Sequence, residues 1–203
     1  MIRKLSIGLL ACLLITVSVM AQDMEHQNVI CLNTGASLIG IFAGFDTGGK
    51  SFSKIPIQLT YDRMVTDRIS VGGAFSYQKM GVSYSNDSIF DVNGTLIKIE
   101  DFTTTAQRLN FAVRGLFHYV KVDNFDLYSG LRIGATYWDL TTTSSDPTYD
   151  PVTDLLNKLG TTLFSPQLIL IGTRYYFVEN IGVNAEFAIG SPSFFSVGLS
   201  ARF

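Results

Sequence analysis

Apolar and polar side chains alternate with a period of two along most of the chain, from about residue 29 to the end. Residues 195–203 are the clearest case, because the odd positions are apolar or aromatic and the even positions are small or polar. Successive side chains of a β-strand point to opposite faces, so the pattern predicts strands that each have one apolar face. It predicts eight strands, near residues 29–41, 55–62, 69–78, 108–119, 127–137, 163–177, 181–190 and 195–203.

The segments between these strands alternate in length. The segments 63–68, 120–124 and 178–180 are short, whereas 80–105 and 139–161 are long. Short turns at one end and longer loops at the other are typical of outer-membrane barrels. A spanning sheet cannot leave its backbone polar groups bare in hydrocarbon, so it must close on itself. We therefore expect an all-β fold, an eight-stranded antiparallel transmembrane β-barrel with up-and-down connections.

The aromatic residues support the same arrangement. If the first strand starts at the end with the short turns, many aromatic side chains fall at that one rim. Aromatic belts of this kind mark the interface between membrane and water. The predicted belt comprises Tyr61, Phe117, Tyr119, Phe125, Tyr175, Phe177 and Phe203.

The N-terminus has the character of a cleaved signal peptide over residues 1–21. Two basic residues precede the apolar run 5–19, which ends in the small-x-small pattern Val19-Met20-Ala21. This run is shorter than the ~20 residues that a membrane-spanning helix needs. A lipidation site at Cys12 is a weaker alternative, because it would leave part of the apolar run unprocessed. The predicted mature barrel domain is 22–203.

The amino-acid composition excludes some classes of function. The formal net charge is −2, so no basic field points to nucleic acid. Charged residues make up 16% of the chain, below the roughly 25% of an average soluble domain. After cleavage only Cys31 would remain, which excludes an internal disulfide framework, and we interpret it as a small apolar side chain.

Three stretches resemble a known family. Residues 195–203, Phe-Ser-Val-Gly-Leu-Ser-Ala-Arg-Phe, resemble the C-terminal insertion signal of outer-membrane barrels, and 172–182 and 67–72 resemble two of their hairpins. The family is that of small OmpA/OmpX-like outer membrane β-barrel domains, often labelled the porin family. The resemblance implies a location in the cell outer membrane, with membrane lipids and the barrel-assembly machinery as partners. It also implies an insertion signal formed by Phe203, Ala201 and Leu199.

Charged residues on the inward faces are candidates for a polar network in the lumen. Charge that is buried in a narrow barrel must be paired or hydrated. Glu186 falls near mid-barrel, and Arg132 and Arg174 are its expected partners. Such a network is either a gate or a structural plug, and the plug is the favoured interpretation. The predicted network comprises Arg114, Arg132, Arg174, Glu186 and Arg202.

The sequence contains few residues in arrangements typical of a catalytic or metal-binding site. The chain has two histidines, His26 and His118, and neither Ser nor Asp lies within two residues of His118. Acidic residues in the long segments do not have the spacing of a calcium loop. We therefore predict no catalytic site, no metal and no cofactor.

Three functions remain at this point. One is a structural or surface-interaction barrel that contacts surface ligands through 80–105 and 139–161. Another is a narrow porin-like channel for small solutes. The last is a soluble periplasmic barrel of lipocalin type, which would need an apolar interior and a polar exterior. The nearly continuous apolar face, opposed by Arg, Glu and Asn, favours membrane insertion over the lipocalin type.

Overall fold

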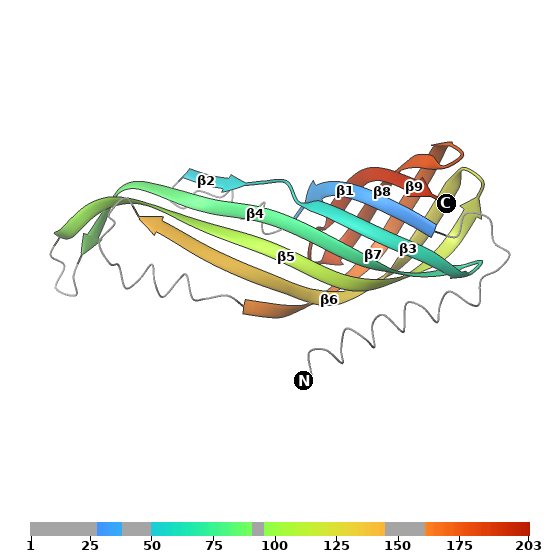
Figure 1. The fold of residues 1–203 in the computed structure, drawn as a ribbon, viewed down its shortest axis with the longest axis horizontal. Coiled ribbons are helices and arrows are strands. Elements are labelled where there is room, and N and C mark those ends of the chain that lie inside the picture. Colours follow the sequence, from blue (N-terminus) through green and yellow to red (C-terminus); the bar gives the residue numbers. More distant parts are fainter. Residues whose placement is uncertain (1–27, 38–49, 91–95, 145–160) are drawn as a thin grey trace.

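The computed structural model describes residues 28–37, 50–90, 96–144 and 161–203 (Figure 1). The predicted signal peptide, Cys12 and His26 lie outside these residues. No helix in the described part of the chain is long and apolar enough to cross a membrane.

The described residues form strands that join into one antiparallel sheet. The strands are β1 (Asn28–Ala36), β2 (Lys50–Ser53), β3 (Ile57–Thr66), β4 (Ile69–Phe90), β5 (Leu96–Val122), β6 (Phe125–Ser144), β7 (Thr161–Val178), β8 (Ile181–Gly190) and β9 (Phe195–Arg202).

Eight of these strands close a barrel. Around the ring the described strands run β4-β3-β1-β9-β8-β7-β6-β5, and β5 pairs back onto β4. β2 adds only a short pairing to Met80–Ser83 of β4, beyond the start of β3. The predicted eight-stranded antiparallel meander is therefore confirmed, with the first and last strands paired to each other.

The two ends of the barrel differ. At the end that we call the turn end, hairpins turn over only two residues each, at 67–68, 123–124 and 179–180. Both Asn28 and Phe203 lie at this end, joined by two backbone hydrogen bonds of 2.9 and 3.0 Å. The opposite end, the loop end, is the one beyond which β4, β5 and β6 extend (Figure 1).

The prediction of loops over 80–105 and 139–161 is wrong for much of their length. β4 and β5 continue through Met80–Phe90 and Leu96–Thr105, and β6 continues to Ser144. Threonines pair across these extensions, and the hydroxyls of Thr104 and Thr142 are 3.1 Å apart. β-branched threonine favours strands but is polar, so the strand propensity persists where the alternation of apolar and polar residues fades.

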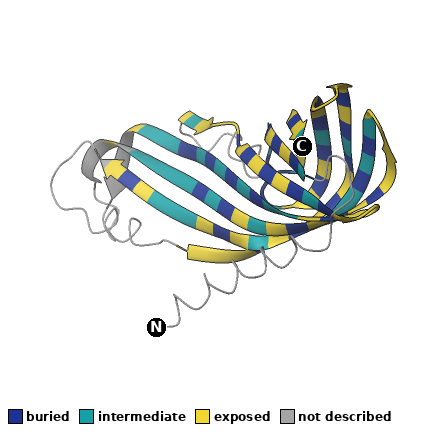
Figure 2. Cartoon of the chain, turned by 45° about the vertical axis from the view of Figure 1, so that its right-hand side comes forward, coloured by how far each residue is buried: buried dark blue, intermediate teal, exposed yellow. Residues whose placement is uncertain are grey.

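The faces of the barrel are inverted relative to a soluble protein. In β3, Ile57 and Leu59 are 56% and 47% exposed, whereas Gln58, Thr60 and Asp62 are buried. Figure 2 shows the same alternation of buried and exposed bands along neighbouring strands. Among the described residues, buried polar side chains outnumber buried apolar ones.

The aromatic side chains predicted for one rim lie at the turn end. Tyr61, Tyr119 and Tyr175 are exposed close to the two-residue turns, and Phe203 is exposed at the chain end. Two of the hydroxyls are anchored locally, Tyr61 to the Asn28 side chain at 2.8 Å and Tyr119 to Ser129 at 2.6 Å. Tyrosines with an apolar ring and a hydrogen-bonded hydroxyl suit an interface between lipid and water.

Candidate functional site

Glu186 of β8 lies at the centre of a buried polar network. Its Oε1 atom is 2.5 Å from Arg114 Nη2 and accepts a hydrogen bond of 2.8 Å from the Tyr128 hydroxyl. Its Oε2 atom accepts from Arg132 Nη2 at 3.2 Å. The carboxylate is thereby bound from β5 and β6, and charge-assisted hydrogen bonds of this kind are the strongest in proteins.

A second carboxylate extends the network toward the turn end. Asp62 of β3 is 3.0 Å from Arg114 Nε and also pairs with Arg174 of β7. Arg174 in turn donates to Asp126 of β6 at 3.2 Å. Arginines and carboxylates therefore alternate along the lumen, which compensates charges that would otherwise be costly to bury.

Tyr128 lies between Glu186, which accepts a hydrogen bond from its hydroxyl, and Arg174, which covers its ring. The Arg174 guanidinium lies 4.5 Å from the centre of its ring. Opposite the ring is Gly172, where an added Cβ would approach the ring carbons to 2.2 Å. The glycine is therefore required for the ring to lie across the lumen.

At the loop end of the lumen, the connection between β8 and β9 is bound by inward-facing side chains. Gln167 donates to the Ser193 carbonyl at 2.5 Å, and Arg108 donates to the Pro192 carbonyl at 2.6 Å. Gln167 also accepts from Arg132 at 2.6 Å, which links this connection to the Glu186 network. Pro192 and Ser193 are both buried, so the connection folds into the barrel mouth.

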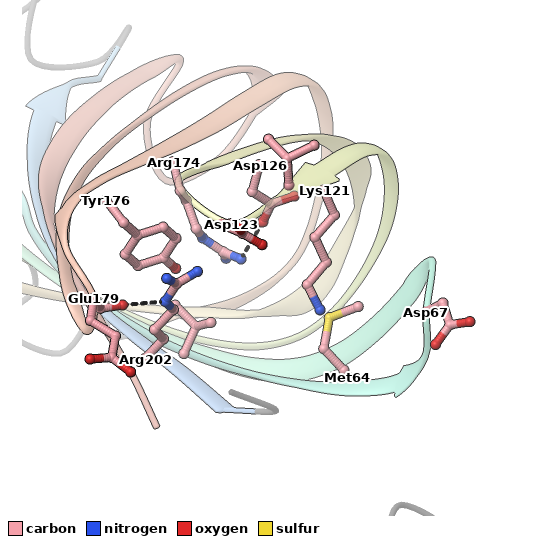
Figure 3. A pocket seen from close by; sticks show the side chains of 11 residues that line it. Met64, Asp67, Lys121, Asp123, Asp126, Arg174, Tyr176, Glu179 and Arg202 are labelled. Atoms are coloured by element: carbon pink, nitrogen blue, oxygen red, sulfur yellow. Dashed lines mark hydrogen bonds and ion pairs between the residues drawn. The ribbon is translucent and has the colours of Figure 1, made fainter. Parts of the chain in front are cut away.

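The turn end of the lumen holds an open cavity of about 560 Å³ (Figure 3). Arg174 and Asp126 lie in its wall, so the cavity borders the charged network. Its lining residues are Val29, Met64, Asp67, Lys121, Val122, Asp123, Asp126, Arg174, Tyr176, Glu179 and Arg202.

The sequence prediction of the network is corrected at two positions. Arg174 pairs with Asp62 and Asp126, not with Glu186, whose second arginine is Arg114. Arg202 lies in the cavity wall, where it donates to the Glu179 carbonyl at 2.6 Å and covers the Tyr176 ring. Alternation identifies the face on which a side chain lies, but strand tilt and stagger decide its depth in the barrel.

A constellation around His118 was missed at the sequence level. Its Nδ1 atom is 2.6 Å from Asp126 Oδ1, and its Nε2 atom is 2.9 Å from Ser70 Oγ. The serine is 48 residues away in the chain and the aspartate eight, so no local sequence motif links them to His118. The β4–β5 and β5–β6 pairings bring the three residues together.

The predicted insertion signal lies on the outer face. Leu199 and Phe203 are 59% and 58% exposed, and Ala201 is exposed beside them. β9 pairs with both β8 and β1, so these residues border the seam where the barrel closes. Cys31 is free and buried, facing the lumen with the other buried positions of β1. Within the described ranges, no group of three metal-ligating side chains is gathered.

No family model matches the chain, and no curated protein sequence matches it. Solved structures similar to it include the outer membrane protein Ail of Yersinia pestis in a phospholipid nanodisc, with 17% identity and a TM-score of 0.42 over 88% of this chain and 100% of that one. The Escherichia coli outer membrane protein W has 14% identity and a TM-score of 0.43 over 90% and 100%. The N-terminal β-barrel domain of Pseudomonas aeruginosa OprF has 13% identity and a TM-score of 0.40 over 88% and 100%. Likenesses at this level carry no conclusion of their own, and the fold assignment rests on the strand pairings.

Proposed function

We propose that the chain is an integral outer-membrane β-barrel protein with a structural or surface-interaction role and a filled lumen. The observation that carries this proposal is the inversion of the two faces. The outer surface presents large apolar side chains from every strand of the ring, while the interior holds buried arginines and carboxylates.

An exposed apolar belt of this kind is unfavourable in water. Removing apolar surface from water stabilises a protein by roughly 25 cal/mol per Å². Monomeric soluble proteins rarely expose apolar patches larger than a few hundred Å². Lipid tails around the ring would remove this surface from water, and the closed sheet leaves no unpaired edge in the ring to meet the hydrocarbon.

The lumen supports a filled barrel rather than a channel. With eight strands, side chains just fill the interior. Here Glu186 and its partners lie across the centre, and the Pro192 and Ser193 carbonyls are bound at the loop end. A lipocalin-type carrier is disfavoured because its apolar ligand needs an apolar interior.

The extensions of β4, β5 and β6 supply the surface for interaction. They project beyond the loop end together with β2 (Figure 1), and they pair through Thr103–Thr143 and Thr104–Thr142. In the proposed orientation this end faces the outside of the cell. Surface ligands would then contact the protein through 80–105 and 139–161, and the turn end with Phe203 would face the periplasm and the assembly machinery.

Conductance and gel mobility together test this proposal. The purified full-length protein is reconstituted in planar bilayers, and parallel samples are run unheated and heated on a gel. We expect a heat-dependent mobility shift and no stepwise conductance. Regular conductance steps would support the narrow channel instead, and a protein that stays in the soluble periplasmic fraction would contradict the membrane assignment.

A further inference from the structure

His118 joins Asp126 and Ser70 in one hydrogen-bonded chain. An ionised Asp126 carboxylate only accepts hydrogen bonds, so Nδ1 of His118 carries the proton that it shares at 2.6 Å. In the neutral ring, Nε2 is then the acceptor, and Ser70 Oγ lies 2.9 Å from it. The second carboxylate oxygen of Asp126 is bound by Arg174 at 3.2 Å, which fixes the orientation of the aspartate.

This is the atom-by-atom arrangement in which histidine acts as a general base toward serine. A nucleophile and its base within hydrogen-bond reach, with the base oriented by a carboxylate, are the signature of an activated serine. We propose that Ser70 is a nucleophile toward small carboxylic esters that enter the turn-end cavity. This activity goes beyond the proposed structural and surface-interaction role.

Ser70 lies opposite a residue of the cavity wall in the sheet. Ser70 is 1% exposed and is not itself in the cavity wall. Met64 is its cross-strand partner on the same inward face, and Met64 does line the cavity. Methionine has three rotatable bonds and adapts to neighbouring groups, so Met64 serves as a movable cover over Ser70.

Two further features fit an esterase site. A volume of about 560 Å³ lies in the range of small-molecule pockets. Lys121 and Met64 both lie in the wall of this cavity (Figure 3). A cation there can stabilise the negative charge that develops on an attacked carbonyl oxygen.

The reaction needs only the ester and water. The Ser70 hydroxyl proton passes to His118 Nε2 as Oγ bonds to the carbonyl carbon. The ester C–O bond then breaks, and the leaving alcohol takes the proton from His118. Water from the cavity attacks the acyl-serine in the same way, which releases the carboxylic acid and restores Ser70.

A fluorophosphonate probe, which bonds covalently to activated serines, tests the proposal on the full-length protein in detergent. We expect peptide mapping to place the probe on Ser70 of the unchanged protein, with parallel hydrolysis of p-nitrophenyl butyrate. Ser70→Ala should abolish both signals. Ser76→Ala, a buried serine on the same strand and face, is the matched control and should leave both unchanged.

Two more variants distinguish a loss of Ser70 reactivity from a loss of the folded barrel. His118→Gln should lower the rate of labelling at least about 100-fold in protein that keeps its heat-dependent mobility. Met64→Ala should raise the rate of labelling by opening the cavity to Ser70. If the probe labels this variant but not the unchanged protein, Ser70 is still supported as the nucleophile and Met64 is identified as its cover. Absence of probe from both the unchanged protein and Met64→Ala would overturn the proposal, as would undiminished labelling of Ser70→Ala.

Discussion

Neutralising Glu186 probes the centre of the lumen directly. Glu186→Gln keeps the shape of the side chain but removes the charge that faces Arg114 and Arg132. Arg114 retains Asp62 at 3.0 Å, whereas Arg132 retains only the neutral oxygens of Gln167 and Gln58. Breaking a buried ion pair from one side typically costs ~3–5 kcal/mol.

The retained Asp62 contact places the expected loss near the lower end of that range, at about 3 kcal/mol. Equilibrium urea unfolding in lipid vesicles measures it, with the fluorescence of Trp138, the one tryptophan of the chain, as the probe. Asp123→Asn is the matched control, because it also replaces a carboxylate by the amide of the same shape, at an exposed turn position.

Two results would refute this reasoning. A loss within about 0.5 kcal/mol of the control would place Glu186 outside any important network, since surface changes have effects of that size. A stable variant that begins to conduct in planar bilayers would mean that the Glu186 cluster acts as a gate. The plug interpretation expects lower stability and no conductance in either form.

The other predictions concern the outer face, the chain end and the topology. Val113→Arg, at the middle of the lipid-facing side of β5, should destabilise the barrel by ~2–4 kcal/mol in urea unfolding, against ~0–1 for Val120→Arg near its turn end; equal losses would contradict a membrane belt. Deletion of Phe203 should reduce the amount of heat-modifiable barrel in the membrane fraction, and undiminished assembly would argue against an insertion signal. Protease added to intact cells should cleave within 80–105 or 139–161, whereas cleavage confined to the two-residue turns would reverse the orientation.

The strands and their faces could be predicted because the alternation is a local property of the chain. In β9, each odd residue is apolar and faces outward, and no knowledge of its neighbours is needed to see this. The extension of β5 could not be predicted in the same way. Thr103, Thr104 and Thr105 are all polar, so their pairing with β6 leaves no period of two in hydropathy.

The partners within the lumen could not be predicted because they depend on how the strands are offset. Arg174 and Glu186 both face inward on neighbouring strands, yet Glu186 is opposite Gly172 and Arg174 is opposite Asn184. That offset of two residues places Arg174 beside Asp62 and Asp126 instead. Register shifts in the β5–β6 and β6–β7 pairings add further offsets that the sequence does not reveal.

The asymmetry of the lumen makes the proposed filled barrel compatible with the proposed reactivity of Ser70. Arg108 and Gln167 bind backbone carbonyls of the β8–β9 connection at the loop end, so this connection occupies part of that mouth. The turn end lacks such a connection among the described residues and instead holds the cavity that Asp126 borders. A hydrolytic site needs access for ester and water from one side only, whereas a channel needs both. In the proposed orientation the ester would therefore approach Ser70 from the turn-end cavity, on the periplasmic side.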